Sequence, residues 1–488
     1  MKWICERLTS NMRVRLCLLA TALITITICS TSSPLYPINL WVDPNTYFTV
    51  GKSMLHGLVP YRDVFDHKGP YLYVLHGIAW LIDHDGFLFI WMVEIACCYF
   101  FLLFSFRILK LFAGKGILWL MPVLSLLVYT SDAFYRGDSV EELSLPLLSY
   151  ALYLAIRSLK GNGRIEHREF FLVGITSGII FWMKFNLTGF YLAWVILPLV
   201  QALKDKDYAL IRSMVFGVAC GVIAVTVPVL FYFSYHHALD SLIDVYFITN
   251  IFQYGNSYTT ELPGALFSLS KILKSIFKNP ELWALIFLGL VFLWKEYRIL
   301  FTQVLLMIFV GFLFIFGKGS WYRYYTFIFS CFCCFGMIPV YRLLRPYAGK
   351  CSMKTRKWIL GASCAFIFQF CLTMLSMNTE YLLCPRTSMP QFQFAEIIAQ
   401  SDDPSLLTYR SMDMGFLTAG NLLPPCRYYC ILNADKDAAL AAQDAMIREG
   451  ATNFVVTYRE DFSSPLYELC EEMQYPHRST HYFLYKRK

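Results

Sequence analysis

The sequence has few charged residues for its length. Of its 488 residues, 16% are Asp, Glu, Lys or Arg, whereas soluble domains usually carry about 25%. Hydrophobic residues make up 57%, and apolar runs near the ~20 residues needed to cross a bilayer recur along most of the chain. This pattern excludes a soluble globular protein and predicts a polytopic membrane protein.

The basic residues do not form a nucleic-acid patch, although the net charge is +8. They lie in short loops between apolar runs, which is the positive-inside distribution of membrane proteins. Most of the 16 cysteines lie within apolar runs, where cysteine behaves as a small hydrophobe. Four in the polar C-terminal part could form disulfides outside the cell, but spacing does not pair them; these are Cys384, Cys426, Cys430 and Cys470.

The N-terminus resembles a signal peptide, because basic residues precede an apolar run. We predict an uncleaved first span, since cleavage would remove the anchor just before Asp43. Loop charges then give about eleven crossings, with the N-terminus in the cytoplasm and the C-terminal part extracytoplasmic. The predicted spans lie at about 13–34, 86–110, 116–131, 140–158, 169–186, 188–203, 211–235, 281–296, 299–317, 321–342 and 357–377.

Two helices are predicted to lie on the outer surface rather than to cross it. If residues 71–82 crossed, the following span would deliver Arg107, Lys110 and Lys115 to the outside, against the charge rule. Residues 266–276 carry leucines on one helical face and lysines on another, which is typical of an interfacial amphipathic helix. The first outer loop is therefore predicted to cover residues 35–85.

From about residue 380 the composition becomes polar and mixed. We predict a transmembrane domain, 1–379, and a small extracytoplasmic α/β accessory domain, 380–488. The latter has no Gly-rich phosphate loop, metal-spaced Cys/His set or nucleophile elbow. The predicted strands are 406–409, 454–458 and 481–485, and the predicted helices are 392–400, 436–449 and 464–472.

Four polar sets lie on the predicted outer side, at residues 43–47, 61–70, 136–142 and 317–325. Together they could line one cavity suited to transferring a group from a phosphate-linked lipid. A carboxylate would take the proton from an acceptor hydroxyl, while Lys or Arg would stabilise the leaving phosphate.

The ordered combination of these motifs carries a family resemblance. An outer loop beginning with Asp43, a Lys68-Gly69-Pro70 segment before a Leu/Tyr-rich helix, and the acidic motif GDSVEELSLP at 137–146 resemble the GT-C membrane glycosyltransferases. The chain looks most like the bacterial relatives of the protein O-mannosyltransferases and of the aminoarabinose transferase that modifies lipid A. The resemblance covers roughly residues 13–380, and the C-terminal part is similar only in its placement.

The resemblance implies a mainly α-helical membrane enzyme that moves one sugar from a polyprenyl-phosphate donor, with inversion and without a nucleotide sugar. Its acceptor would be an extracytoplasmic glycan, lipid or protein, and its location the plasma membrane, with no nucleic-acid partner. Asp43 falls at the position of the catalytic base, and Glu141 or Glu142 at that of the second acidic residue. The expected phosphate-binding residues are Lys68, Arg136 and Arg323, and the expected substrate-binding residues are Tyr47, Asp63, Asp66, His67, Tyr324 and Tyr325.

Two departures from the family pattern bear on cofactors. Gly69 stands where the aminoarabinose branch has proline, and Pro44 stands where related enzymes often carry a second acidic residue. We assign no metal ligand and no certain cofactor, and we leave a divalent metal in the first loop open.

Each assignment has a structural alternative. Asp43 could cap a helix that starts near Asn45, residues 66–68 could be a solvated turn, and Glu141 and Glu142 could favour a helix dipole. Arg323 among tyrosines could be an interfacial anchor. As a whole, the chain could instead be a transporter or flippase, a polysaccharide polymerase or ligase of the cell envelope, or a non-catalytic protein of the same fold.

Overall fold

The computed structural model describes residues 2–114, 116–253, 264–317, 321–348 and 357–488. The described chain is mainly helical, at 67%. It forms two compact units. Unit 1 comprises Met1–Ser30, Met92–Thr226 and Thr260–Thr379, and unit 2 comprises Thr31–Trp91, Val227–Thr259 and Glu380–Lys488.

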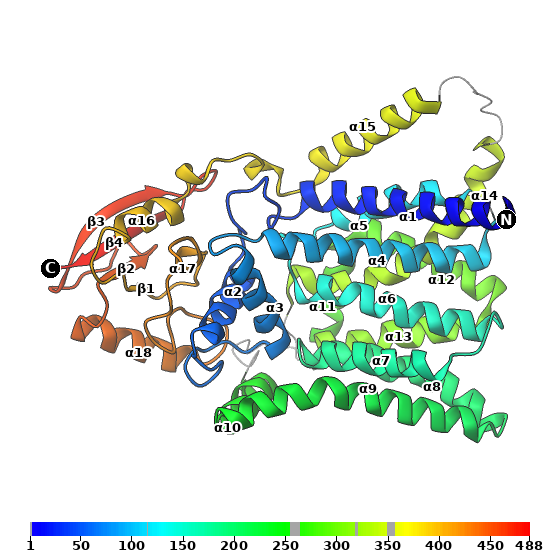
Figure 1. Cartoon of the computed structure of the whole chain (residues 1–488), viewed down its shortest axis with the longest axis horizontal. Coiled ribbons are helices and arrows are strands. Elements are labelled where there is room, and N and C mark those ends of the chain that lie inside the picture. Colours follow the sequence, from blue (N-terminus) through cyan, green and yellow to red (C-terminus); the bar gives the residue numbers. More distant parts are fainter. Residues whose placement is uncertain (1, 115, 254–263, 318–320, 349–356) are drawn as a thin grey trace. The chain divides into compact units, whose positions relative to one another are not determined.

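Unit 1 consists of long apolar helices that lie side by side (Figure 1). A helix is present at every position where the sequence predicts a span. The helices that lie in unit 1 for all or most of their length are α1(Lys2–Cys29), α4(Leu88–Phe112), α5(Leu120–Tyr129), α6(Val140–Leu159), α7(His167–Phe181), α8(Gly189–Lys204), α9(Tyr208–Tyr235), α11(Gly264–Lys278), α12(Pro280–Glu296), α13(Arg298–Phe316), α14(Cys333–Ala348) and α15(Lys357–Leu375), with the shorter η1(Ile117–Trp119), η2(Phe185–Thr188), η4(Arg323–Phe332) and η5(Thr379–Tyr381), the last of which runs into unit 2.

Among the described residues, six helices are long and apolar enough to cross a membrane. A seventh is added if the pair Leu269–Lys278 and Pro280–Glu296, bent by 104°, counts as one span. These helices make the chain a multi-pass membrane protein. The larger count of about eleven crossings stays a prediction.

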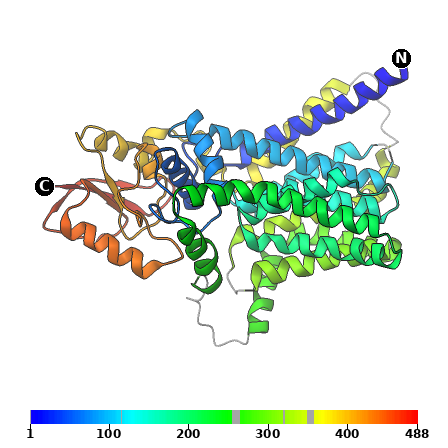
Figure 2. The same ribbon diagram turned by 60° about the horizontal axis from the view of Figure 1, so that its bottom comes forward.

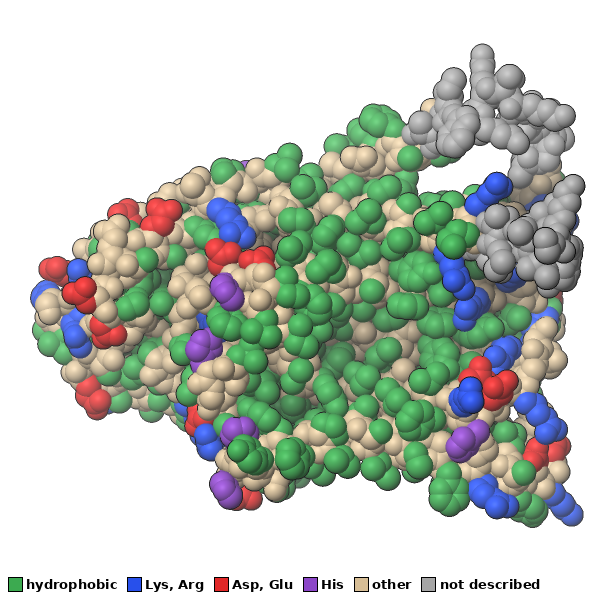
Figure 3. All heavy atoms as spheres, in the orientation of Figure 1, with side chains coloured by type: hydrophobic (Ala, Val, Ile, Leu, Met, Phe, Trp, Pro, Cys, Tyr) green, Lys and Arg blue, Asp and Glu red, His purple; other side chains and the backbone are tan. Residues whose placement is uncertain are grey.

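The surface of the unit 1 helices agrees with this reading. Figure 3 shows hydrophobic side chains covering the visible face of these helices, while Lys and Arg gather at the end where α1 begins. Several of the basic residues that the sequence predicts to be cytoplasmic lie at or near helix ends, among them Arg107, Lys160, Lys204 and Arg298. Helices α1 and α15 lie side by side although most of the chain separates them (Figure 2).

Unit 2 combines short helices with a small sheet. Its elements are α2(Val42–Leu55), α3(Pro70–Ile82), α10(Leu239–Leu242), the π-helix η3(Ile243–Gln253), η6(Arg386–Ser388), α16(Pro390–Ile398), β1(Leu406–Thr408), α17(Phe416–Ala419), α18(Lys436–Glu449), β2(Phe454–Thr457), β3(Tyr467–Gln474) and β4(His481–Arg487). The predicted interfacial helix 71–82 is present as α3; its place at a membrane surface stays a prediction.

The four strands are ordered β1-β2-β4-β3. β1 and β2 pair in parallel, with Leu406 opposite Phe454, and α18 lies between them in the chain. β4 pairs antiparallel with both β2 and β3. Most of the strands and helices predicted for this part of the chain are therefore confirmed, within one or two residues at most ends. They are the strands at 406–409, 454–458 and 481–485 and the helices at 392–400 and 436–449.

The predicted helix at 464–472 is wrong, because this segment forms the edge strand β3. Tyr467 is buried and the next five residues are exposed, so the segment lacks the apolar stripe that a packed helix needs. Its backbone instead pairs with β4 from Tyr467↔Arg487 to Gln474↔His481, with an irregularity between Leu469 and Glu471.

The predicted domain boundary coincides with one point where the chain changes unit, between Thr379 and Glu380. Unit 2 also contains residues 31–91 and 227–259, and an accessory domain confined to 380–488 stays a prediction. The four polar cysteines for which disulfides were open are free thiols: Cys384, Cys426, Cys430 and Cys470.

Candidate active site

Asp43 lies in the first turn of α2, not at its cap. The helix begins at Val42 with Trp41 as the N-cap, so the alternative of a cap for a helix starting near Asn45 is wrong. Pro44 is tolerated this early in the helix because the first N–H groups have no helical partner. A carboxylate in the first turn is favoured by the helix dipole, and the side chain of Asp43 remains 22% exposed.

The loop before α3 brings Lys68 to Asp43. The Lys68 Nζ lies 3.9 Å from Oδ2 of Asp43 and 3.1 Å from Nε2 of His67. An ammonium group only donates hydrogen bonds, so Nε2 of His67 is the acceptor and Nδ1 carries the ring proton. Nδ1 faces Oδ1 of Asp66 at 3.5 Å. Tyr47 donates its hydroxyl hydrogen to Oδ2 of Asp43 at 3.4 Å.

Two buried phenols fix the backbone of Lys68. The hydroxyls of Tyr61 and Tyr73 lie 2.6 Å and 2.9 Å from the Lys68 carbonyl oxygen. Tyr73 also lies 2.9 Å from Oδ2 of Asp66. The amide of Asn250 holds the His67 carbonyl at 2.6 Å. Residues 66–68 therefore form a buried segment that is held by hydrogen bonds. The alternative of a solvated turn is wrong.

Burial raises the pKa of Asp66 above its ordinary value. The Lys68 ammonium, the backbone N–H of His67 and the Tyr73 hydroxyl counteract part of this rise. Asp63, by contrast, is only partly buried. Its hydrogen bonds with Arg62 and with the N–H of Val59 lower its pKa. Its role in binding substrate stays a prediction.

Close packing of α2 on α3 positions Asp43. A Cβ on Gly51 would lie 2.4 Å from both the Gly77 nitrogen and the Tyr73 carbonyl oxygen, so only glycine allows the two backbones to approach this closely. Tyr47 on α2 meets His76 on α3 edge to face, with ring centroids 5.4 Å apart.

The far end of α2 is tied to the C-terminal part of unit 2. Lys52 is 1% exposed and donates to the Leu417 carbonyl at 3.0 Å. Burial lowers the pKa of Lys52 to about 7, although the nearby Asp413 carboxylate acts in the opposite direction. Burial raises the pKa of Asp413 to about 6, although the hydrogen bonds that it accepts from the N–H groups of Gly415 and Phe416 lower that pKa.

In unit 1, the acidic motif 137–142 is anchored by a residue that sequence reasoning missed. The backbone N–H of Asp138 donates to Oε1 of Glu94 and to Oε2 of Glu142, both at 2.8 Å. Ser30 donates to Glu94 at 2.8 Å. The N–H of Asp138 therefore brings the Glu94 and Glu142 carboxyl groups to the same buried place. A lone acid inside the apolar run of α4 was the available signal.

The same motif holds Glu141 against a lysine from another connection. Glu141 is buried, and its Oε1 lies 2.6 Å from Nζ of Lys184. The Lys184 ammonium also lies 4.0 Å and 5.3 Å from the ring centroids of Tyr325 and Tyr324, within range of cation–π attraction. Oε2 of Glu141 is buried and has no hydrogen-bond partner among the described residues.

The two predicted phosphate-binding arginines of unit 1 contact protein groups. Arg136 is 6% exposed and donates to Asn378 at 2.8 Å. Arg323 is 47% exposed and pairs with Asp132 at 3.0 Å, while Lys318 of the same set lies outside the described residues. The first two polar sets belong to unit 2 and the last two to unit 1; that they line one cavity stays a prediction. Over the described part of the chain, no group of three or more His, Cys, Asp or Glu has the geometry to hold a metal ion.

In its fold, the chain is similar to the GT-C membrane glycosyltransferases. ArnT from Cupriavidus metallidurans, a lipid A aminoarabinose transferase, has this fold. The structure of that enzyme bound to undecaprenyl phosphate matches with a TM-score of 0.58 and 12% sequence identity, covering 98% of each chain. Its apo structure matches with a TM-score of 0.54 and 12% identity, covering 99% of this chain and 98% of that one. No protein-family model and no curated protein sequence matches. The resemblance is therefore confirmed at the level of the fold.

Proposed function

We propose that this protein is a membrane glycosyltransferase that moves a sugar from a polyprenyl-phosphate donor to an extracytoplasmic acceptor by inverting single displacement. The observation that carries this proposal is the 3.9 Å approach of the Asp43 carboxylate to the Lys68 ammonium, on a fold like that of ArnT. The ArnT structure with undecaprenyl phosphate supports a lipid phosphate as the donor carrier.

Lys68 is proposed to bind the donor phosphate. Its ammonium carries three donors, and its backbone is held by two phenols while its Nζ contacts His67 and Asp43. A lysine fixed in this way needs little rearrangement to stabilise the negative charge that develops on a leaving phosphate. Asp66 and His67 act here as supports for the lysine rather than as direct substrate ligands.

Asp43 is proposed as the general base. The acceptor hydroxyl oxygen attacks the anomeric carbon, its proton passes to the Asp43 carboxylate, and the carbon–oxygen bond to phosphate breaks with its electron pair on the phosphate oxygen. Attack from the face opposite the phosphate inverts the anomeric centre. The partial exposure of Asp43 leaves it accessible to an acceptor.

Between the two candidates for the second acidic residue, the contacts favour Glu141. Glu142 accepts the N–H of Asp138 within its own motif, whereas Glu141 pairs with Lys184, whose ammonium lies against the rings of Tyr325 and Tyr324. Each glutamate has one buried oxygen without a hydrogen-bond partner among the described residues. Glu141, Tyr324 and Tyr325 are proposed to contact the sugar, and Arg323 the phosphate.

The test compares membranes containing the wild-type chain, Asp43→Asn and the control Asp402→Asn, which changes an exposed carboxylate with no charged partner in the described structure. Each receives radiolabelled polyprenyl-phosphate sugars, and label is counted in lipid, glycan and protein fractions. Transfer by the wild type and by Asp402→Asn, with loss in Asp43→Asn, supports the proposal. Equal transfer in all three contradicts Asp43 as the base. Absence of transfer from every donor, with folded protein, favours a transporter.

A further inference from the structure

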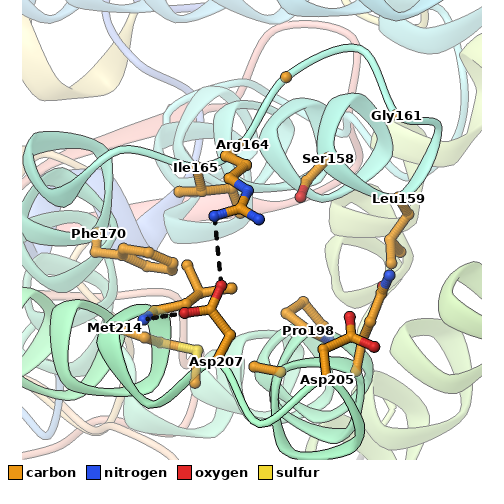
Figure 4. Close-up of a pocket in the computed structure, with 14 residues that line it drawn as sticks. Ser158, Leu159, Gly161, Arg164, Ile165, Phe170, Pro198, Asp205, Asp207 and Met214 are labelled. Carbon is orange, nitrogen blue, oxygen red and sulfur yellow. Dashed lines mark hydrogen bonds and ion pairs between the residues drawn. The ribbon is translucent and has the colours of Figure 1, made fainter.

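A cavity of about 240 Å³ lies in unit 1, where the α6–α7 and α8–α9 connections meet. Its lining combines charged and polar groups, including Ser158, Arg164, Asp205 and Asp207, with apolar ones such as Phe170 (Figure 4). The cavity is smaller than the ~300–1,000 Å³ pockets that bury drug-sized ligands, so it suits a small polar group with a short apolar attachment.

The cavity lies at the ends of two candidate membrane spans, where lipid headgroups are expected. Helices α8 and α9 both qualify as membrane spans, and the cavity is lined by residues where α8 ends and α9 begins. The neighbouring connections carry the cations that the sequence places in the cytoplasm. This location does not depend on the proposed enzymatic function.

The cation of the cavity is held in place but remains available. Arg164 is 86% exposed, and its Nη1 lies 3.4 Å from Oδ2 of Asp207. Its backbone is fixed by Arg157, which donates to the Arg164 carbonyl at 3.0 Å and is itself committed to Glu169 at 2.8 and 2.5 Å. A guanidinium has five N–H donors, so Arg164 retains donors for a phosphate group.

The two carboxylates of the cavity have different surroundings. Asp207 uses Oδ1 to accept the N–H of Leu210, at the start of α9, and Oδ2 to pair with Arg164. Asp205 is exposed and makes no ion pair or hydrogen bond through its carboxylate in the described structure. Figure 4 shows the Arg164–Asp207 pair on one side of the cavity and Asp205 on the other. The C-terminal ends of α6 and α8 add partial negative charge.

We propose that this cavity binds the headgroup of a membrane phospholipid that carries both a phosphate and a primary ammonium, that is, phosphoethanolamine. Arg164 binds the phosphate oxygens, and Asp205 accepts hydrogen bonds from the ammonium. The apolar wall with Phe170 contacts the glycerol and the first acyl carbons. A purely anionic headgroup fits less well, because the lining places two carboxylates beside one guanidinium.

The experiment uses the full-length protein, purified in detergent and stripped of lipid. Binding of phosphatidylethanolamine, phosphatidylcholine and phosphatidylglycerol is measured by titration with thermal unfolding as the readout. We expect phosphatidylethanolamine to bind about tenfold more tightly than the other two, because a trimethylated ammonium donates no N–H bond and glycerol carries no charge. Arg164→Gln and Asp205→Asn should each weaken its binding by about tenfold or more.

The matched controls are Lys206→Gln, a cation of the same connection that does not line the cavity, and soluble phosphoethanolamine. Lys206→Gln should bind phosphatidylethanolamine like the wild type. Equal binding of all three lipids, or unchanged binding in both cavity variants, overturns the proposal. Binding of soluble phosphoethanolamine as tight as that of the lipid overturns the assignment to a membrane lipid.

Discussion

The contact between α2 and α3 offers a direct test of how Asp43 is positioned. In Gly51→Ala, the new Cβ would lie 2.4 Å from the Gly77 nitrogen and from the Tyr73 carbonyl, whereas ordinary contact begins at 3.4 Å. Both neighbours are backbone atoms that no rotamer change can move, so the helices must separate by about 1 Å, the difference between these two distances.

The size of the effect follows from two opposing terms. Alanine in a helix is about 0.5–1 kcal/mol more favourable than glycine, but overpacking of this kind costs about 1–3 kcal/mol. We therefore expect a net loss of up to about 2.5 kcal/mol in the free energy of unfolding. Displacing Asp43 by ~1 Å should lower sugar transfer by about 100-fold.

Two other glycines provide the comparison. A Cβ on Gly77 would lie 2.9 Å from the Gly51 carbonyl oxygen, and one on Gly114 would meet nothing within 4 Å. Thermal unfolding in detergent and transfer in membranes should therefore rank Gly51→Ala as the most damaged, Gly77→Ala as intermediate and Gly114→Ala as wild-type-like. If Gly51→Ala unfolds and transfers like Gly114→Ala, the packing of α2 on α3 does not position the site.

Three further predictions concern buried charges. Lys68→Gln should weaken binding of undecaprenyl phosphate by about 10- to 150-fold, because a hydrogen bond to a charged group is worth about 1.5–3 kcal/mol; unchanged affinity in a titration would contradict its phosphate role. Glu94→Gln keeps an oxygen that can accept hydrogen bonds from Ser30 and from the N–H of Asp138, whereas Glu94→Ala leaves buried partners unsatisfied at about 1–3 kcal/mol each. Only the alanine variant should therefore lose thermal stability, and equal losses would refute this. Because burial lowers the pKa of Lys52 to about 7 from 10.5, the folded chain binds fewer protons than the unfolded chain between these values, and stability should rise with pH across that window. Unfolding midpoints recorded from pH 7 to 10 should rise in the wild type and stay level in Lys52→Met. If the midpoints of Lys52→Met rise as steeply as those of the wild type, Lys52 is not the source of the pH dependence.

The sequence by itself determined the features that depend on local composition and periodicity. Long apolar runs can satisfy their backbone groups in lipid only as helices, which is why a helix lies at each predicted span. The strands around Leu406, Phe454 and His481 were also predicted, because short apolar segments between polar turns have few other folded states. The motifs of the first loop and of residues 137–146 sufficed to indicate the fold class.

Tertiary structure decided which of the charged residues act together. Glu94 and Asp138, and likewise Glu141 and Lys184, are distant in sequence, and no local pattern pairs them. The segment at 464–472 failed as a helix because pairing with β4 outweighs local preference for residues whose side chains stay exposed.

The pairing of Asp43 with Lys68 has the same origin. It depends on α2 and α3 meeting at two glycines, so that a helix start and a distant loop come within 3.9 Å. A sequence specifies which residues are polar and which are apolar, but the register of packing between elements sets the distances between them. The candidate site residues could thus be named from the sequence, whereas their partners and the cavity between the α6–α7 and α8–α9 connections followed only from the packed helices.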